Sequence, residues 1–149
     1  MKPLSVLLVE DEVLIAMLYT QVLEDMGHTI CGTESTEAGA VAAAARYEPD
    51  MMIVDARLRD GSGISAMTKI LLTRQVPHVF VSGDVSGVKA LRPDAVVIQK
   101  PFFASDLARA MQLALGVQGS DAIHAGGTEG PSRMRKLRPS LQKSAEPKV

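Results

Sequence analysis

Residues 4–12 read LSVLLVEDE, a short apolar run that ends in three acids. Three later runs repeat this arrangement, because each is a few apolar residues long and is followed by a polar side chain. They are 51–54 before Asp55, 79–81 before Ser82, and 95–98 before Gln99 and Lys100. If the runs are parallel strands, these polar side chains emerge at one edge of a single sheet, where open α/β sheets bind ligands. The pattern therefore predicts a site built from carboxylates, a hydroxyl and an amine.

The segments between these runs carry helical spacing, which predicts the fold class. A further strand is expected at 29–33, and helices are expected at 13–26, 36–47, 64–73, 85–91 and 105–115. Because parallel strands need helical crossovers, five strand–helix units predict an α/β fold with a doubly wound, parallel, five-stranded sheet. The runs at 4–9 and 51–54 are almost wholly apolar, as expected of central strands buried on both faces.

Charge and composition divide the chain in two. Residues 1–116 hold 10 Lys and Arg against 14 Asp and Glu, whereas residues 117–149 hold 6 against 3. We expect residues 1–116 to form one domain and residues 117–149, which are low in complexity, to be a disordered tail. The net charge of −1 gives no broad basic surface for nucleic acid, and the single cysteine excludes an internal disulfide. With no signal peptide and no apolar stretch of membrane-spanning length, we expect a cytoplasmic protein without membrane or DNA partners.

The polar strand ends suit phosphoryl chemistry. Glu10, Asp11 and Asp55 supply hard oxygen ligands, and Mg²⁺ is commonly bound by one or two carboxylates and several waters. Asp55, at the centre of the sheet edge, is the candidate nucleophile, because a carboxylate that attacks phosphorus forms an aspartyl phosphate. Lys100 would bring a positive charge to one phosphoryl oxygen, and Ser82 a hydrogen bond to another. Any one acid at a strand end is commonly just a solvated loop residue, but four such ends in this order make coincidence a poor explanation.

Four short motifs in this arrangement resemble the receiver domain of two-component response regulators. They are LLVEDE at 7–12, IVD at 53–55, FVSG at 80–83 and KPF at 100–102. The resemblance covers residues 4–115 and implies a flavodoxin-like strand order of 2-1-3-4-5. It also implies that a sensor histidine kinase phosphorylates Asp55, with Ser82 as the family's phosphate-responsive hydroxyl and Lys100 as its invariant lysine. The Mg²⁺ ligands that it implies are Glu10, Asp11, Asp55 and the backbone carbonyl of Arg57.

Four positions near the site are expected to modulate phosphorylation. Receivers usually carry Tyr or Phe three residues before the lysine, but here that residue is Val97, so we expect the signal to be relayed by reshaping of residues 84–91. Arg57 and Asp84 each lie two residues after a reactive position, and we expect them to pair across the mouth of the site and hinder an attacking water. Gly83 should leave the site open to a phosphodonor or a phosphatase.

The resemblance predicts a function in signalling through protein–protein contacts. The stretch PHVFVSG at 77–83 is similar to a subgroup of stand-alone receivers with Pro-x-x-Phe-Ala-Thr-Gly, and the tail is too short for an output domain. We therefore expect a single-domain response regulator, monomeric or weakly dimeric when phosphorylated, that acts as a switch, a phosphate sink or a relay. It would not be an enzyme beyond catalysing its own phosphorylation and dephosphorylation.

Two other classes of protein compete with this interpretation. The alternative is a pseudo-receiver, a constitutive interaction module that never carries phosphate; the missing ring at Val97 favours it, and the retained chemical residues oppose it. A phosphatase with an aspartyl intermediate is disfavoured, because Arg57 stands where such sites commonly place a second acid.

Overall fold

Five parallel strands form one sheet in the order β2-β1-β3-β4-β5, as the sequence predicted. Their bounds are β1 Ser5–Val9, β2 Thr29–Glu34, β3 Met51–Asp55, β4 His78–Ser82 and β5 Val97–Gln99. The computed structural model of the chain describes residues 1–126. The chain divides into two units, Met1–Gln118 and Gly119–Val149, and all the strands of this sheet belong to the first.

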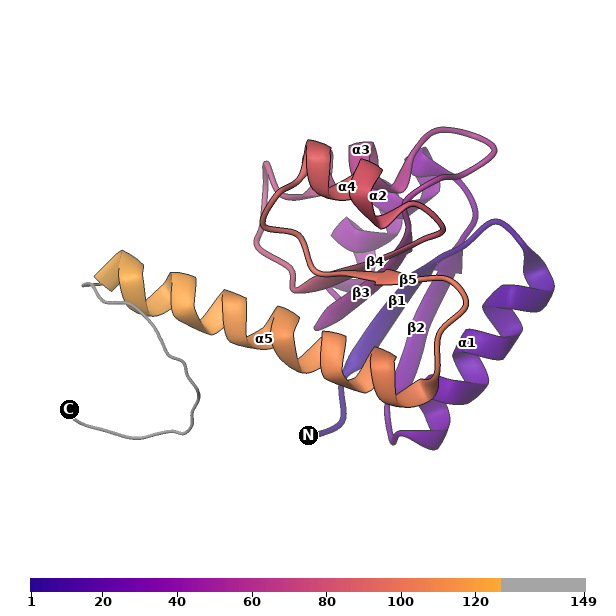
Figure 1. The fold of residues 1–149 in the computed structure, drawn as a ribbon, viewed down its shortest axis with the longest axis horizontal. Coiled ribbons are helices and arrows are strands. Elements are labelled where there is room, and N and C mark those ends of the chain that lie inside the picture. The colour runs from indigo at the N-terminus through magenta and orange to yellow at the C-terminus, as the bar shows by residue number, and fades with distance from the viewer. Residues whose placement is uncertain (127–149) are drawn as a thin grey trace. The chain divides into compact units, whose positions relative to one another are not determined.

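Helices cover both faces of the sheet and create two apolar layers. Their bounds are α1 Val13–Asp25, α2 Glu37–Tyr47, α3 Gly63–Ile70, α4 Val85–Leu91 and α5 Ala104–Gly126. Figure 1 shows α2, α3 and α4 over one face and α1 with the first turns of α5 over the other. Alternate residues of each central strand enter opposite layers: Leu7 of β1 packs beneath α2 and α3, whereas Leu8 packs beneath α1 and α5. The central strands are therefore buried on both faces, as predicted.

Several element boundaries differ from the sequence-based expectation. Helix α3 ends at Ile70 rather than Thr73, because the Leu72 and Thr73 amides bond to carbonyls three residues back, as in the tightened last turn of a helix. Strand β5 begins at Val97 rather than Ala95, because the Ala95 amide is used in a turn with the Arg92 carbonyl.

The last helix also runs further than expected. Helix α5 extends to Gly126, whereas the sequence predicted an end near Leu115, just before Gly116. A glycine ends a helix when it adopts the left-handed conformation, but Gly116 stays helical and costs the helix only about 1 kcal/mol. Residues 127–149 of the predicted tail lie outside the described residues. No helix within residues 1–126 is long and apolar enough to cross a membrane.

Candidate functional site

The register of the sheet brings the polar strand ends together. Val9 of β1 pairs with Val54 of β3. The residues that follow them, Glu10 and Asp55, are therefore neighbours at the edge of the sheet. A cavity of about 430 Å³ opens there, lined in part by Asp11, Asp55, Arg57, Ser82, Gly83, Asp84 and Lys100. Seven of the nine residues that the sequence singled out therefore line one cavity. Glu10 is buried beside it, and Val97 lies elsewhere.

Three carboxylates converge at this cavity, hereafter the acidic cavity: Asp11 and Asp55 line it, and Glu10 is buried beside it. Glu10, Asp11 and Asp55 each offer an oxygen within 4.8 Å of the other two. Oε2 of Glu10 accepts a hydrogen bond from the Glu12 amide at 3.1 Å, but Oε1 is buried without a hydrogen-bond partner among the described residues. Burial raises the pKa of Glu10 to about 7, and the nearby Asp55 carboxylate adds to the rise. A buried carboxylate oxygen without a hydrogen bond, beside two other carboxylates, is an arrangement that fits a divalent cation.

Lys100 supplies the positive charge of the site. Its Nζ lies 2.7 Å from Oδ2 of Asp55 and 3.9 Å from Oε1 of Glu10. Burial alone would lower the pKa of Lys100, but the hydrogen bond and the charge of Asp55 outweigh it and the pKa is raised. The ammonium group therefore stays charged and contacts the candidate nucleophile directly.

Backbone amides complete the surroundings of the acids. Arg57 donates its amide to Oδ1 of Asp55 at 3.2 Å, and Arg59 donates its amide to Oδ2 of Asp11 at 2.6 Å. Sequence reasoning missed Arg59, whose guanidinium also lies 3.9 Å from Asp11. The position of Arg59 in the loop after Asp55 could have indicated that its guanidinium lies near the site. The hydrogen bond from its backbone amide could not have been predicted, because no side-chain pattern indicates a backbone donor.

The expected pair between Arg57 and Asp84 is not present among the described residues. Both line the acidic cavity, but the Asp84 carboxylate accepts the Gly87 amide at 3.0 Å and caps the start of α4. The Asp84 amide in turn donates to Oγ of Ser82 at 2.9 Å. A methyl group at Gly83 would meet no atom within 4 Å, so the space beside this residue is open; access of a phosphodonor or phosphatase at Gly83 stays a prediction.

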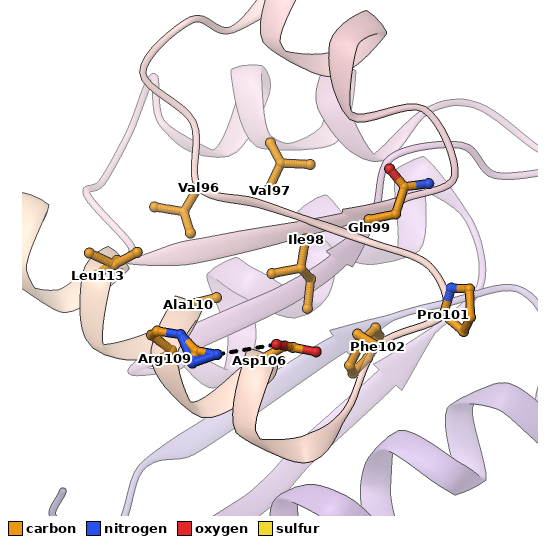
Figure 2. A pocket seen from close by; sticks show the side chains of 10 residues that line it. All are labelled: Val96, Val97, Ile98, Gln99, Pro101, Phe102, Asp106, Arg109, Ala110 and Leu113. Carbon is orange, nitrogen blue, oxygen red and sulfur yellow. Dashed lines mark hydrogen bonds and ion pairs between the residues drawn. The ribbon is translucent and has the colours of Figure 1, made fainter.

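Val97 lies in a second hollow, of about 370 Å³, between β5 and the start of α5 (Figure 2). Gln99 lies at the end of the same strand and also lines this hollow. The Gln99 side-chain amide donates to the Gly83 carbonyl at 2.9 Å, which ties the end of β5 to the loop that follows Ser82. Residue 97 is not aromatic, but the contact from Gln99 to Gly83 joins β5 to the loop after Ser82.

Residues 6–112 match the family model of the response regulator receiver domain. The chain belongs to this family. Receiver domains are signalling modules of two-component systems, and they bind Mg²⁺ at an acidic pocket. The cluster of Glu10, Asp11 and Asp55 is the corresponding feature of this receiver.

Two curated relatives are each 34% identical to this receiver. The phyllosphere-induced regulator PhyR of Methylorubrum extorquens aligns over 78% of this chain and 45% of its own length. The transcriptional regulatory protein PdtaR of Mycobacterium tuberculosis aligns over 76% of this chain and 57% of its own length. The chain thus spans about half the length of these relatives.

Solved structures agree with the fold of the receiver. The receiver domain of PhyR from Erythrobacter litoralis superposes with a TM-score of 0.69 at 27% identity, covering 89% of this chain and 97% of that domain. The anti-anti-sigma factor PhyR of Bartonella quintana superposes with a TM-score of 0.69 at 28% identity, covering 85% of this chain and 52% of the other.

Proposed function

We propose that this receiver accepts a phosphoryl group on Asp55 from a sensor histidine kinase. The observation that carries the proposal is the position of Asp55 at the end of the middle strand, with its Oδ2 atom 2.7 Å from Lys100 Nζ and other carboxylates within 4.8 Å. A nucleophilic carboxylate, a fixed cation and a set of hard oxygen ligands are the groups that phosphoryl transfer needs.

Mg²⁺ would be held by Glu10, Asp11, Asp55 and the backbone carbonyl of Arg57. Oε1 of Glu10 supports this assignment, because it is buried without a hydrogen-bond donor among the described residues and its nearest cation, Lys100 Nζ, is 3.9 Å away. A Mg²⁺ ion held there would supply positive charge that offsets the negative charge of the acids and of the transferred phosphoryl group.

The transfer itself needs little covalent work from the protein. An Asp55 carboxylate oxygen forms a bond to phosphorus while the phosphorus–nitrogen bond of the donor phosphohistidine breaks, and its electron pair returns to the imidazole. Lys100 then faces a phosphoryl oxygen instead of the free carboxylate, and the Ser82 hydroxyl donates a hydrogen bond to another. Position and charge thus supply the rate, as is usual for phosphoryl transfer.

A protein phosphodonor suits the surface beside the cavity. Helix α1 begins directly after Glu12, which lines the cavity, and four large apolar side chains of its first turns are exposed. They are Val13 at 73%, Leu14 at 78%, Met17 at 62% and Leu18 at 58% exposure. Contiguous exposed apolar residues are typical of protein interaction sites.

Intact mass after incubation with Mg²⁺ and acetyl phosphate tests the proposal. We expect one phosphate adduct on the wild type, none on Asp55→Asn, and none when a chelator replaces Mg²⁺. If acetyl phosphate gives no adduct, a panel of phosphorylated histidine kinases is the second donor. Failure with both donors would overturn the proposal and favour a constitutive interaction module, the alternative that Val97 supports.

A further inference from the structure

The loop between β3 and α3 forms one wall of the acidic cavity. Its residues Arg57, Leu58 and Arg59 line the cavity, and its amides bond to two of the three carboxylates. Arg57 pairs with Ser62 in an isolated antiparallel bridge, so the two ends of the loop face each other. The position of the Arg57 amide and carbonyl therefore depends on where Ser62 is held.

One carboxylate on another helix holds Ser62. Glu37, the first residue of α2, accepts the Ser62 amide on Oε1 at 3.0 Å. Its Oε2 accepts the Ser65 hydroxyl at 2.6 Å and pairs with Lys69 Nζ at 2.7 Å. The Glu37 amide also donates to the Asp60 carbonyl at 3.1 Å. A single residue of α2 thus contacts both the end of the loop and the start of α3.

The backbone of the loop is shaped to fit this carboxylate. Gly61 has a φ of +93°, a conformation that favours glycine, and a Cβ there would lie 2.5 Å from the Cβ of Glu37. The bond from Lys69, with those from Ser65 and Ser62, lowers the pKa of Glu37 to about 2. The carboxylate is therefore ionised over the whole working range of pH.

We propose that Glu37 is a positioning residue for the phosphorylation site. It fixes Ser62, and through the bridge to Arg57 it sets the loop backbone that faces Asp55 and would hold Mg²⁺. The inference rests on the proposed function, which supplies the role of the Arg57 carbonyl. It goes further by assigning a role to a side chain that does not line the cavity. Substituting a residue that orients a metal ligand without touching the metal commonly lowers metal affinity by about 10-fold to 100-fold.

A purely structural role for Glu37 would give a different result. Acids in the first turn of a helix stabilise it wherever they occur, and Asp106 of α5 provides the matched case. Its carboxylate accepts the Phe103 amide at 2.9 Å and pairs with Arg109 at 3.2 Å. Asp106 makes the same kinds of contact as Glu37 but lines the hollow of Figure 2 instead of the acidic cavity.

The test is calorimetric titration of the full chain with Mg²⁺ alone, together with the melting temperature of each variant. We expect Glu37→Gln to weaken Mg²⁺ binding by about tenfold. Asp106→Asn should lower the melting temperature but leave Mg²⁺ affinity within twofold of wild type. Ser65→Ala removes one of the three contacts of the Glu37 carboxylate and should weaken Mg²⁺ binding by a smaller factor. This variant replaces Glu37→Gln in the test if Glu37→Gln does not fold.

Two outcomes would overturn the inference while leaving the proposed function intact. The first is that folded Glu37→Gln binds Mg²⁺ as tightly as the wild type does. If Ser65→Ala is used in its place, wild-type affinity in Ser65→Ala counts in the same way. The other is an equal loss of affinity in Asp106→Asn. Absence of Mg²⁺ binding to the wild type would instead overturn the proposed function, and this inference with it.

Discussion

Replacing Glu10 with Gln should stabilise the metal-free protein and abolish most of its response to Mg²⁺. The wild-type side chain is 2% exposed, and its Oε1 lies near two other carboxylates without a hydrogen-bond partner among the described residues. The amide variant keeps one oxygen for the Glu12 N–H and directs an NH₂ group toward the Asp55 carboxylate. It therefore removes a charge from a crowded site and adds a donor.

The size of the effect follows from the cost of an unsatisfied buried group. Such a group costs about 1–3 kcal/mol, and a charged one costs more. We therefore expect the free energy of unfolding of Glu10→Gln to exceed that of wild type by about 1–3 kcal/mol in a chelator at about pH 8. Saturation with Mg²⁺ to a hundredfold excess over its dissociation constant should add about 2.7 kcal/mol to the wild type. The variant should gain much less, because it lacks one of the three carboxylates.

The pH dependence of this difference has a fixed sign. The pKa of Glu10 rises from 4.5 to about 7 on folding, so the folded state binds the proton more tightly than the unfolded state. The stability that this proton contributes is complete below about pH 4.5 and is lost as the pH rises through about 7. Glutamine does not titrate. The stability advantage of Glu10→Gln without metal should therefore grow from about pH 5 to about pH 8.

Urea denaturation followed by circular dichroism measures these differences, with and without Mg²⁺. Glu24→Gln, an exposed acid of α1, is the matched control and should change neither stability nor the Mg²⁺ response appreciably. A Glu10→Gln variant less stable than wild type in chelator would contradict the cost assigned to the buried carboxylate. A full Mg²⁺ response in the variant would contradict the assignment of Glu10 as a metal ligand.

Two further predictions test the packing and the titration of the fold. Gly63→Ala should destabilise the protein by about 3 kcal/mol in urea denaturation, because the new methyl would overlap the Asp55 carbonyl. Gly83→Ala is the control: its methyl faces open space, so its stability should stay within about 1 kcal/mol of wild type. Equal effects of the two substitutions would contradict this packing. His28 accepts the Leu4 amide on Nδ1, and burial lowers its pKa, so wild type should lose stability as the pH falls below about 6.5. His28→Gln should show a shallower decline between about pH 7.5 and about pH 5, and an unchanged slope would count against this role.

The parallel sheet and the composition of the site were predictable because each depends on local sequence, whereas the order of the strands came from the resemblance to receiver domains. Apolar runs that end in acids predicted parallel strands with a shared polar edge, and the structure places Asp55 at the end of the middle strand. The approach of Lys100 to Asp55 followed from the same logic, since their strands are separated only by β4.

The features that the sequence did not predict depend on competition between contacts. The Arg57–Asp84 pair was expected from spacing alone, but the Asp84 carboxylate caps α4 instead. The contact from Glu37 to Ser62 joins residues 25 positions apart, and neither residue carries a local signal for it. The end of α5 was misplaced because a glycine such as Gly116 ends a helix only when its backbone turns left-handed.

Residue-level mapping of the phosphoryl group shows whether Asp55 is the acceptor. Borohydride reduces an aspartyl phosphate to homoserine, so the wild type is incubated with Mg²⁺ and acetyl phosphate, reduced, digested and sequenced by mass spectrometry. We expect homoserine at position 55, dependent on Mg²⁺, and at no other aspartate. Homoserine at Asp11 or Asp84 in place of Asp55 would contradict it.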